Sequence, residues 1–153
     1  TIWTDRPSRK CEEAFALDEA ICGKTVAEKL DMVRETMEKE HCQNLVLSKL
    51  DDIMWLFNIR GNDVECNPVA LSYAVVTKDN SYLFLQEKAM TDALKTWMAD
   101  QPVVLCDYEN IMSFLKDQAW DGAVLLDKEN ISYAIYKVVK DAKGYEQIVP
   151  VTP

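Results

Sequence analysis

A polar loop between two strongly apolar blocks holds the residues best suited to contact a ligand. The loop covers residues 58–68, inside the stretch LDDIMWLFNIRGNDVECNPVALSY. Arg60 offers a planar guanidinium that can bind two carboxylate or amide oxygens at once, and Asp63 is an acceptor nearby. With Asn58 and Asn67, these are the residues that we expect to face a substrate or a neighbouring domain. The alternative is that Arg60 and Asp63 pair with each other and only fix the loop.

The loop must be positioned by the elements on either side of it. Two acids followed by an apolar block predict a short buried helix over residues 51–57, with the acids at its positive end and Trp55 in the core. Gly61 allows the loop a backbone conformation with positive φ. After the loop, residues 71–77 and 81–85 are predicted strands, joined by a short polar turn into an antiparallel hairpin.

The rest of the chain alternates between helical and strand patterns. Thr25 and Glu28 form a capping-box pattern, and the helix that follows has Lys29 among the charges of its solvated face. Its apolar stripe is made of Val26, Leu30, Val33 and Met37. Further helices are predicted over residues 91–99, 107–119 and 130–140, and further strands over residues 45–48, 103–106, 122–126 and 145–149. The sum is an α/β domain: a mixed sheet of five to six strands with helices on both faces.

Residues able to perform catalysis are scarce in this sequence. There is one histidine, His41, and neither a glycine-rich phosphate motif nor a G-x-S-x-G nucleophile motif is present. The five cysteines are an odd number at wide spacings, without a C-x-x-C pair, which is typical of reduced thiols in a cytoplasmic protein. We therefore expect no catalytic residue, no metal ligand and no cofactor within these residues.

The overall charge excludes two classes of partner. Acidic residues number 26 against 17 basic ones, so the formal net charge is −9. A nucleic-acid-binding surface needs clustered cations, and an anionic lipid surface attracts them too. We expect neither nucleic acid nor membrane as a partner.

The segment around the loop resembles the Xaa-Pro aminopeptidase (aminopeptidase P) family in its long, multi-domain form. In that family a segment of the type LDxIxWLxNxRGxDxxxNPxxxSY lies in the middle domain. Residues 3–7, WTDRP, resemble the link that leaves the family's first domain. The residues matching the longer pattern are Leu50, Asp51, Ile53, Trp55, Leu56, Asn58, Arg60, Gly61, Asp63, Asn67, Pro68, Ser72 and Tyr73.

The resemblance implies a division of labour between domains. The first two domains of the family have the creatinase/prolidase N-terminal fold, which is ribonuclease H-like. The third binds two divalent metal ions, usually manganese, and removes an N-terminal residue that precedes proline. Its metal ligands are not among these residues, so the resemblance implies an enzyme for the full-length parent and a non-catalytic accessory role here. This role would be to shape or cover the active-site cleft, with Arg60 and Asp63 facing it.

The same resemblance implies domain limits and partners. Residues 1–24 would be a lead-in from a preceding domain, residues 25–150 one α/β domain, and residues 151–153 the start of a linker. The partners would be the flanking domains and a peptide with proline at its second position, and a homodimer is allowed. An alternative from a different class is a free-standing module that binds a ligand or a protein with loop 58–68.

Overall fold

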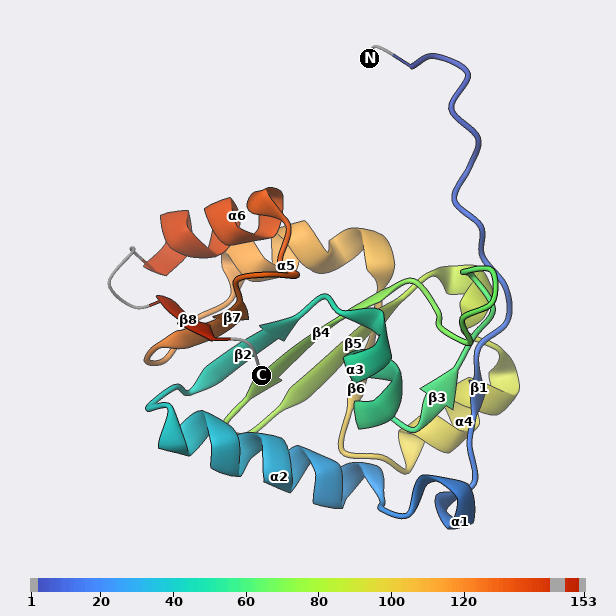
Figure 1. Cartoon of the computed structure of the whole chain (residues 1–153), viewed down its shortest axis with the longest axis horizontal. Coiled ribbons are helices and arrows are strands. Elements are labelled where there is room, and N and C mark those ends of the chain that lie inside the picture. Colours follow the sequence, from blue (N-terminus) through green and yellow to red (C-terminus); the bar gives the residue numbers. More distant parts are fainter. Residues whose placement is uncertain (1–2, 144–147, 152–153) are drawn as a thin grey trace.

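The computed structural model, which describes residues 3–143 and 148–151, has a six-stranded mixed sheet at its centre (Figure 1). The strand order is β6-β5-β4-β2-β7-β8, and a separate two-stranded sheet pairs β1 with β3. The strands are β1 (Phe15–Ala16), β2 (Asn44–Leu47), β3 (Ile59–Arg60), β4 (Ser72–Thr77), β5 (Ser81–Leu85), β6 (Val104–Asp107), β7 (Val124–Asp127) and β8 (Ile148–Val151). The predicted mixed α/β fold is confirmed.

Strand directions follow the predicted pattern of one hairpin and several crossovers. β4 pairs antiparallel with both β2 and β5, and the β4–β5 hairpin is the one expected from the sequence. The β2–β7, β5–β6 and β7–β8 pairs are parallel. The helices are α1 (Glu19–Cys22), α2 (Val26–Lys39), α3 (Leu50–Leu56), α4 (Asp92–Ala99), α5 (Ile111–Asp117) and α6 (Tyr133–Lys143). In the chain, α4 lies between the parallel neighbours β5 and β6, and α6 lies between β7 and β8.

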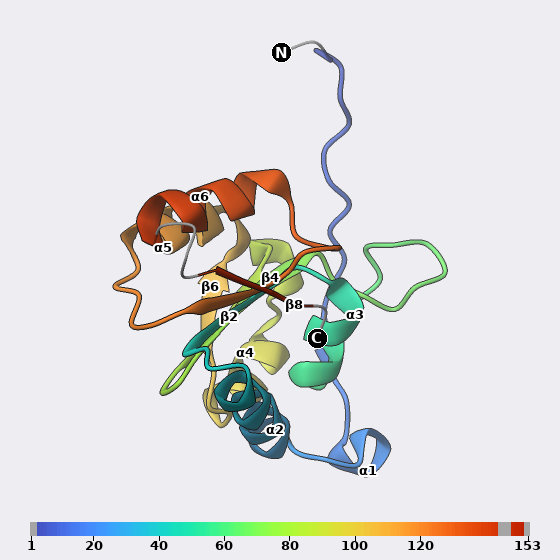
Figure 2. The same cartoon turned by 60° about the vertical axis from the view of Figure 1, so that its left-hand side comes forward.

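Helices cover both faces of the sheet, because side chains alternate along each strand. On β2, Leu45 and Leu47 pack into one apolar cluster with α2, α3 and α4. Val46, between them, packs into a second cluster with α5 and α6. Figure 2 shows these two helical layers on opposite sides of the strands. The described residues therefore form two apolar layers that share one sheet.

The predicted capping box begins α2, and α4 begins within one residue of its predicted start, but two other helices begin later than predicted. Thr25 and Glu28 form the capping box of α2, and Thr91 caps α4. Asp107 caps a 3₁₀ turn over Tyr108–Asn110, and α5 begins only after it. The helix predicted from residue 130 begins three residues later, because the Asn130 side chain bonds back to Asp127. The last predicted strand lies at Ile148–Val151; its predicted residues 145–147 are outside the described residues.

Two residues have the opposite exposure from the one predicted: Lys29 is buried, and Trp55 is exposed. Lys29 was expected on the solvated face of α2, but it is 2% exposed, because its ammonium bonds to the end of α3. Trp55 was expected in the core, but it is 43% exposed. The core side of α3 is taken by Ile53 and Leu56, so the indole lies against Lys29 on the outside of the layer.

Candidate functional site

Arg60 lies on β3, where that short strand pairs with β1. Its backbone pairs in register with Phe15, and Ile59 pairs with Ala16. Its Nη1 donates to the carbonyl oxygens of Met54, at 3.1 Å, and Ile59, at 2.7 Å. Met54 belongs to the last turn of α3, so the guanidinium sits at the negative end of that helix. Among the described residues, the other two guanidinium nitrogens have no hydrogen-bond partner, which leaves them able to bind a carboxylate.

Asp63 joins three segments of the chain through its carboxylate. One oxygen accepts from the backbone N–H of Glu12 and the other from that of Leu71, each at 2.7 Å. The side chain is 7% exposed, and Lys10 donates to the neighbouring Asn62 carbonyl at 2.6 Å. Asp63 thus fixes the loop through backbone groups. The alternative of an Arg60–Asp63 pair is wrong, because the described residues show no ion pair between them.

Asn58 ends α3 with a left-handed backbone, at φ 52°. Its side chain is 2% exposed, and both polar atoms are used within the chain. Oδ1 accepts from Lys29 Nζ at 2.5 Å, and Nδ2 donates to the Lys24 carbonyl at 2.9 Å. Asparagine tolerates this conformation better than most residues, so it suits both the turn and the hydrogen bonds. Asn58 has no free polar group here to offer a substrate.

Gly61 is required by close packing and not by a positive φ, which corrects the prediction. The left-handed positions near the loop are Asn58 and Cys66. A Cβ on Gly61 would lie 2.7 Å from the Ala70 Cβ and 2.8 Å from its backbone nitrogen. The loop returns to Ala70 because the Gly61 N–H bonds to the Pro68 carbonyl and the Asp63 N–H to the Val69 carbonyl.

Asn67 lies at the far side of the loop, on a narrow turn. Its backbone forms a bridge with Val64, and its Nδ2 donates to Asp51 Oδ1 at 3.3 Å. Of the four predicted site residues, the structure brings Arg60 and Asn58 together at the end of α3, whereas Asp63 and Asn67 stabilise the loop farther along. That they face a substrate or another domain stays a prediction.

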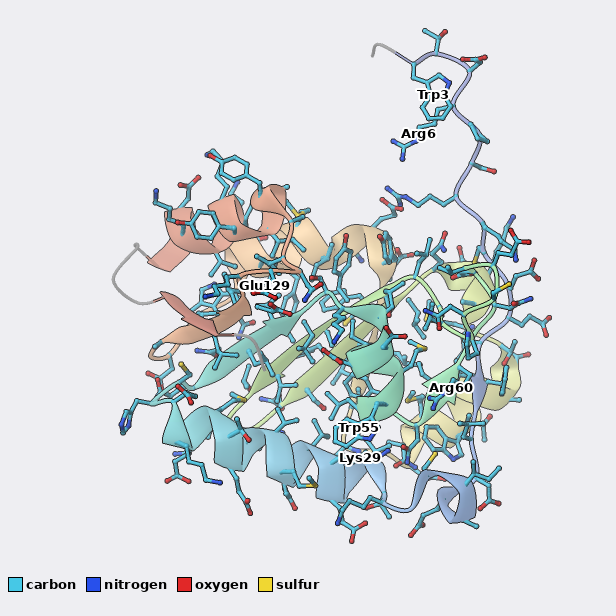
Figure 3. All side chains as sticks on the ribbon, in the orientation of Figure 1. Trp3, Arg6, Lys29, Trp55, Arg60 and Glu129 are labelled. Carbon is cyan, nitrogen blue, oxygen red and sulfur yellow. The ribbon has the colours of Figure 1, made fainter. Side chains whose placement is uncertain are left out.

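Lys29 is the residue of this region that the sequence reasoning missed. Its Nζ donates to Asn58 Oδ1 and to the Trp55 carbonyl, and lies 4.7 Å from the centre of the Trp55 ring (Figure 3). Burial lowers the pKa of the Lys29 ammonium; Cys22 opposes this shift and Arg60 adds to it. A signal was available, because position 29 follows Val26 by three residues and falls within the apolar stripe of the helix.

An apolar groove of about 300 Å³ lies beside this cluster, between α2, α3 and the sheet. Met32 and Val33 form its wall on α2, and Trp55 forms the wall on α3. Its floor includes Leu45 of β2 and Leu125 of β7. We call it the α2–α3 groove.

Neither a metal centre nor a membrane span is found in the part of the chain that the structure describes. No group of three or more His, Cys, Asp or Glu side chains there lies close enough to hold a metal ion. No helix there combines the length and the apolar character that crossing a bilayer requires.

Comparison with known proteins places this geometry in a family. The model of the family "Creatinase/Prolidase N-terminal domain" matches residues 5–153. A protein of Sordaria macrospora named "Probable Xaa-Pro aminopeptidase P" is 41% identical over 111 residues, which are 72% of this chain and 18% of that protein. A protein of the same name from Coprinopsis cinerea is 39% identical over 129 residues, which are 84% of this chain and 21% of that protein. The chain thus spans about a fifth of the length of these relatives.

Solved structures agree with the family match. An X-prolyl aminopeptidase from Caenorhabditis elegans, described as a cytosolic enzyme with a di-nuclear active site, superposes with a TM-score of 0.88 at 28% identity. The superposition covers 99% of this chain and 25% of that one. The N-terminal domain of a metallopeptidase from Corynebacterium diphtheriae superposes with a TM-score of 0.58 at 13% identity, which shows a shared fold alone.

Proposed function

The chain belongs to the creatinase/prolidase N-terminal domain family, and on this premise we propose that it is a non-catalytic accessory domain of an Xaa-Pro aminopeptidase. In the full-length protein it would help to shape the cleft in which the residue before a proline is removed. The observation that carries the proposal is the C. elegans enzyme, which matches almost all of this chain with a quarter of its own.

The metal chemistry of the proposed reaction is assigned to a different domain. The described residues do not fit a di-metal centre, because they bring together no set of three potential ligands. The C. elegans enzyme is described as having a di-nuclear active site, so we propose two divalent metal ions, manganese by resemblance, in the catalytic domain of the parent. No step of catalysis is assigned to a residue of this chain.

The proposed contribution of this domain is a guanidinium held at the surface of a rigid loop. Two carbonyl bonds at the end of α3 fix the orientation of Arg60 and leave its other nitrogens available. A carboxylate of the substrate or of the catalytic domain is the partner that such a group binds best. Closing the cleft with a fixed cation would orient the peptide and exclude water.

The loop gives less support to a free-standing ligand-binding module. Asn58 and Asp63, two of the four polar side chains expected to bind a ligand, are buried and use their polar atoms within the chain. We keep the domain limits at residues 25 and 150 as part of the proposal. Cytoplasmic location and a homodimer are also kept as proposals, the first with support from the cytosolic C. elegans enzyme.

The proposal is tested by comparing the full-length protein with the separate chain of residues 1–153. Purified full-length protein should cleave peptides with proline at the second position and lose this activity with a chelator. The chain of residues 1–153 should cleave none. Turnover by residues 1–153 contradicts the non-catalytic role, and no turnover by the full-length protein contradicts the assigned reaction.

A further inference from the structure

The α2–α3 groove exposes an apolar surface on the outside of the domain. Met32 and Trp55 line it from opposite walls and are each 43% exposed. Below them, Leu45 and Leu125 form a floor that is nearly closed to solvent. Two large apolar side chains facing each other across a groove are typical of a site that another apolar group fills.

The indole of Trp55 is held in position before anything binds. Lys29 Nζ lies 4.7 Å from the ring centre and donates to the Trp55 carbonyl at 2.9 Å. Figure 3 shows the two side chains together between α2 and α3. A cation over an indole restrains the ring, so little conformational entropy is lost when a partner packs on it. Fixed aromatic side chains of this kind contribute strongly to interfaces.

Sheet register brings the end of the described chain to this groove. β8 lies beside β7, with Val149 opposite the floor residue Leu125 and Val151 opposite Asp127. β8, β7 and β2 are parallel, so Val151 lies at the end of the strands where β2 finishes and the chain enters α3. The described chain therefore ends next to the groove, at Val151.

The size of the groove favours an occupant from the same polypeptide. About 300 Å³ accommodates one or two side chains, whereas a separate protein needs about 800 Å² of surface on each partner for a stable complex. A tethered segment needs less contact, because its effective concentration is in the millimolar range. We propose that the α2–α3 groove is filled by the segment that follows residue 153 in the full-length protein, through an apolar side chain that packs between Met32 and Trp55.

This inference rests on the proposed function in one respect: it requires that the chain continue toward a catalytic domain. The relatives support this, since the chain spans about a fifth of their length. The test uses the full-length protein with the photo-crosslinker benzoylphenylalanine in place of Met32. Met112 provides the matched control: it is also a methionine on a helix, 37% exposed, but on α5 at the opposite face of the sheet.

After irradiation, the probe at position 32 should crosslink within one chain to a peptide that begins soon after residue 153. The probe at position 112 should give no such product. Crosslinks to a second copy or to any other part of the chain overturn the inference. The peptidase assay is scored separately, so an inactive protein with the expected crosslink would contradict the proposed function and leave the groove assignment intact.

A second measurement covers the case in which the probe itself displaces the segment. Met32→Glu places a charge in the groove and should raise amide exchange in the segment after residue 153 about tenfold, and Met112→Glu should leave it unchanged. Equal exchange in both variants, with no crosslink at position 32, overturns the inference. Circular dichroism of each variant verifies that the fold is retained.

Discussion

The ammonium of Lys29 donates a hydrogen bond of 2.5 Å to the side-chain oxygen of Asn58, 29 positions along the chain. Both residues are 2% exposed, and the same ammonium also bonds to the Trp55 carbonyl. The bond joins the first turns of α2 to the end of α3, directly before the strand that carries Arg60. The position of the candidate loop therefore depends on a helix far from it in the sequence.

Replacing this lysine should destabilise the domain without unfolding it. Lys29→Met keeps the apolar part of the side chain but leaves the buried Asn58 oxygen without a donor, which costs about 1–3 kcal/mol. Relief of the ammonium's burial offsets part of this cost. The free energy of unfolding in urea measures the difference. Lys95→Met, at an exposed position of α4, should change it by less than about 0.5 kcal/mol; equal effects would contradict the structural role of Lys29.

Asp63→Asn should destabilise the domain even though it preserves the shape of the side chain. Asp63→Asn retains the shape, but its amide group turns a donor toward one of the two backbone N–H groups that the carboxylate accepts. The expected loss is about 2–3 kcal/mol of unfolding free energy, with faster amide exchange at Glu12 and Leu71. Glu65→Gln, on the exposed part of the same loop, is the control. A stability equal to that of the control would show that the carboxylate does not hold the loop.

Gly61→Ala should destabilise the loop through a clash with backbone. The new Cβ would lie within 3.0 Å of three atoms of Ala70, two of them backbone. Overpacking of this kind costs about 1–3 kcal/mol. Adding Ala70→Gly removes only the side-chain contact, so the double variant should recover little of the lost melting temperature. Full recovery would show that side-chain crowding alone explains the glycine.

The sequence predicted the fold well wherever one local signal was enough. The capping box of α2 and the two strands of the β4–β5 hairpin depend on neighbouring residues, and the structure confirms them. The short β1–β3 pair was missed, because two strands of two residues each give no periodicity. Its pairing is set by contacts between segments about 45 positions apart, which local patterns do not record.

Prediction of the candidate site failed at residues whose role depends on a distant partner. Lys29 was expected in solvent from its charge; its position within the apolar stripe indicates burial, but nothing local indicates that Asn58 accepts its hydrogen bond. Trp55 was placed in the core from its apolar surface, although Ile53 and Leu56 already fill the core side of the helix. Arg60 and Asp63 were expected to face a substrate or another domain, which stays a prediction; within the described residues they bond to backbone groups, among them the Met54 carbonyl and the Leu71 N–H.

Alkaline pH should destabilise the domain partly through Tyr108. Burial, and then the hydrogen bond with the Tyr73 hydroxyl, raise the pKa of its phenol above the usual value near 10. Below that pH both states keep the proton; above it the unfolded state loses the proton first, so stability falls as pH rises. Tyr108→Phe should flatten the fall in unfolding free energy above about pH 10. Tyr133→Phe, at a position that is 75% exposed, should leave this fall unchanged. Identical pH profiles for the two variants would contradict the role of Tyr108.

Arg60→Ala tests whether the loop takes part in catalysis by the full-length protein. If the guanidinium contacts a carboxylate of the substrate or the catalytic domain, kcat/KM for an Xaa-Pro peptide should fall about tenfold or more, which is about 1.4 kcal/mol. The stability should fall by less, because the lost bonds to the Met54 and Ile59 carbonyls lie in a partly exposed position where water can replace them.

A matched arginine separates this effect from a general loss of charge. Arg34 on α2 also donates to a backbone carbonyl, that of Thr77, and is distant in the sequence from the candidate loop; unlike Arg60, it lies near an acid, Asp31. Arg34→Ala should lower the melting temperature by a similar amount and leave kcat/KM within about twofold, since an equal loss of stability does not remove a contact in the cleft. Unchanged kinetics for Arg60→Ala with a lower melting temperature would instead assign Arg60 to fixing the end of α3, because only its two carbonyl bonds would then have been lost.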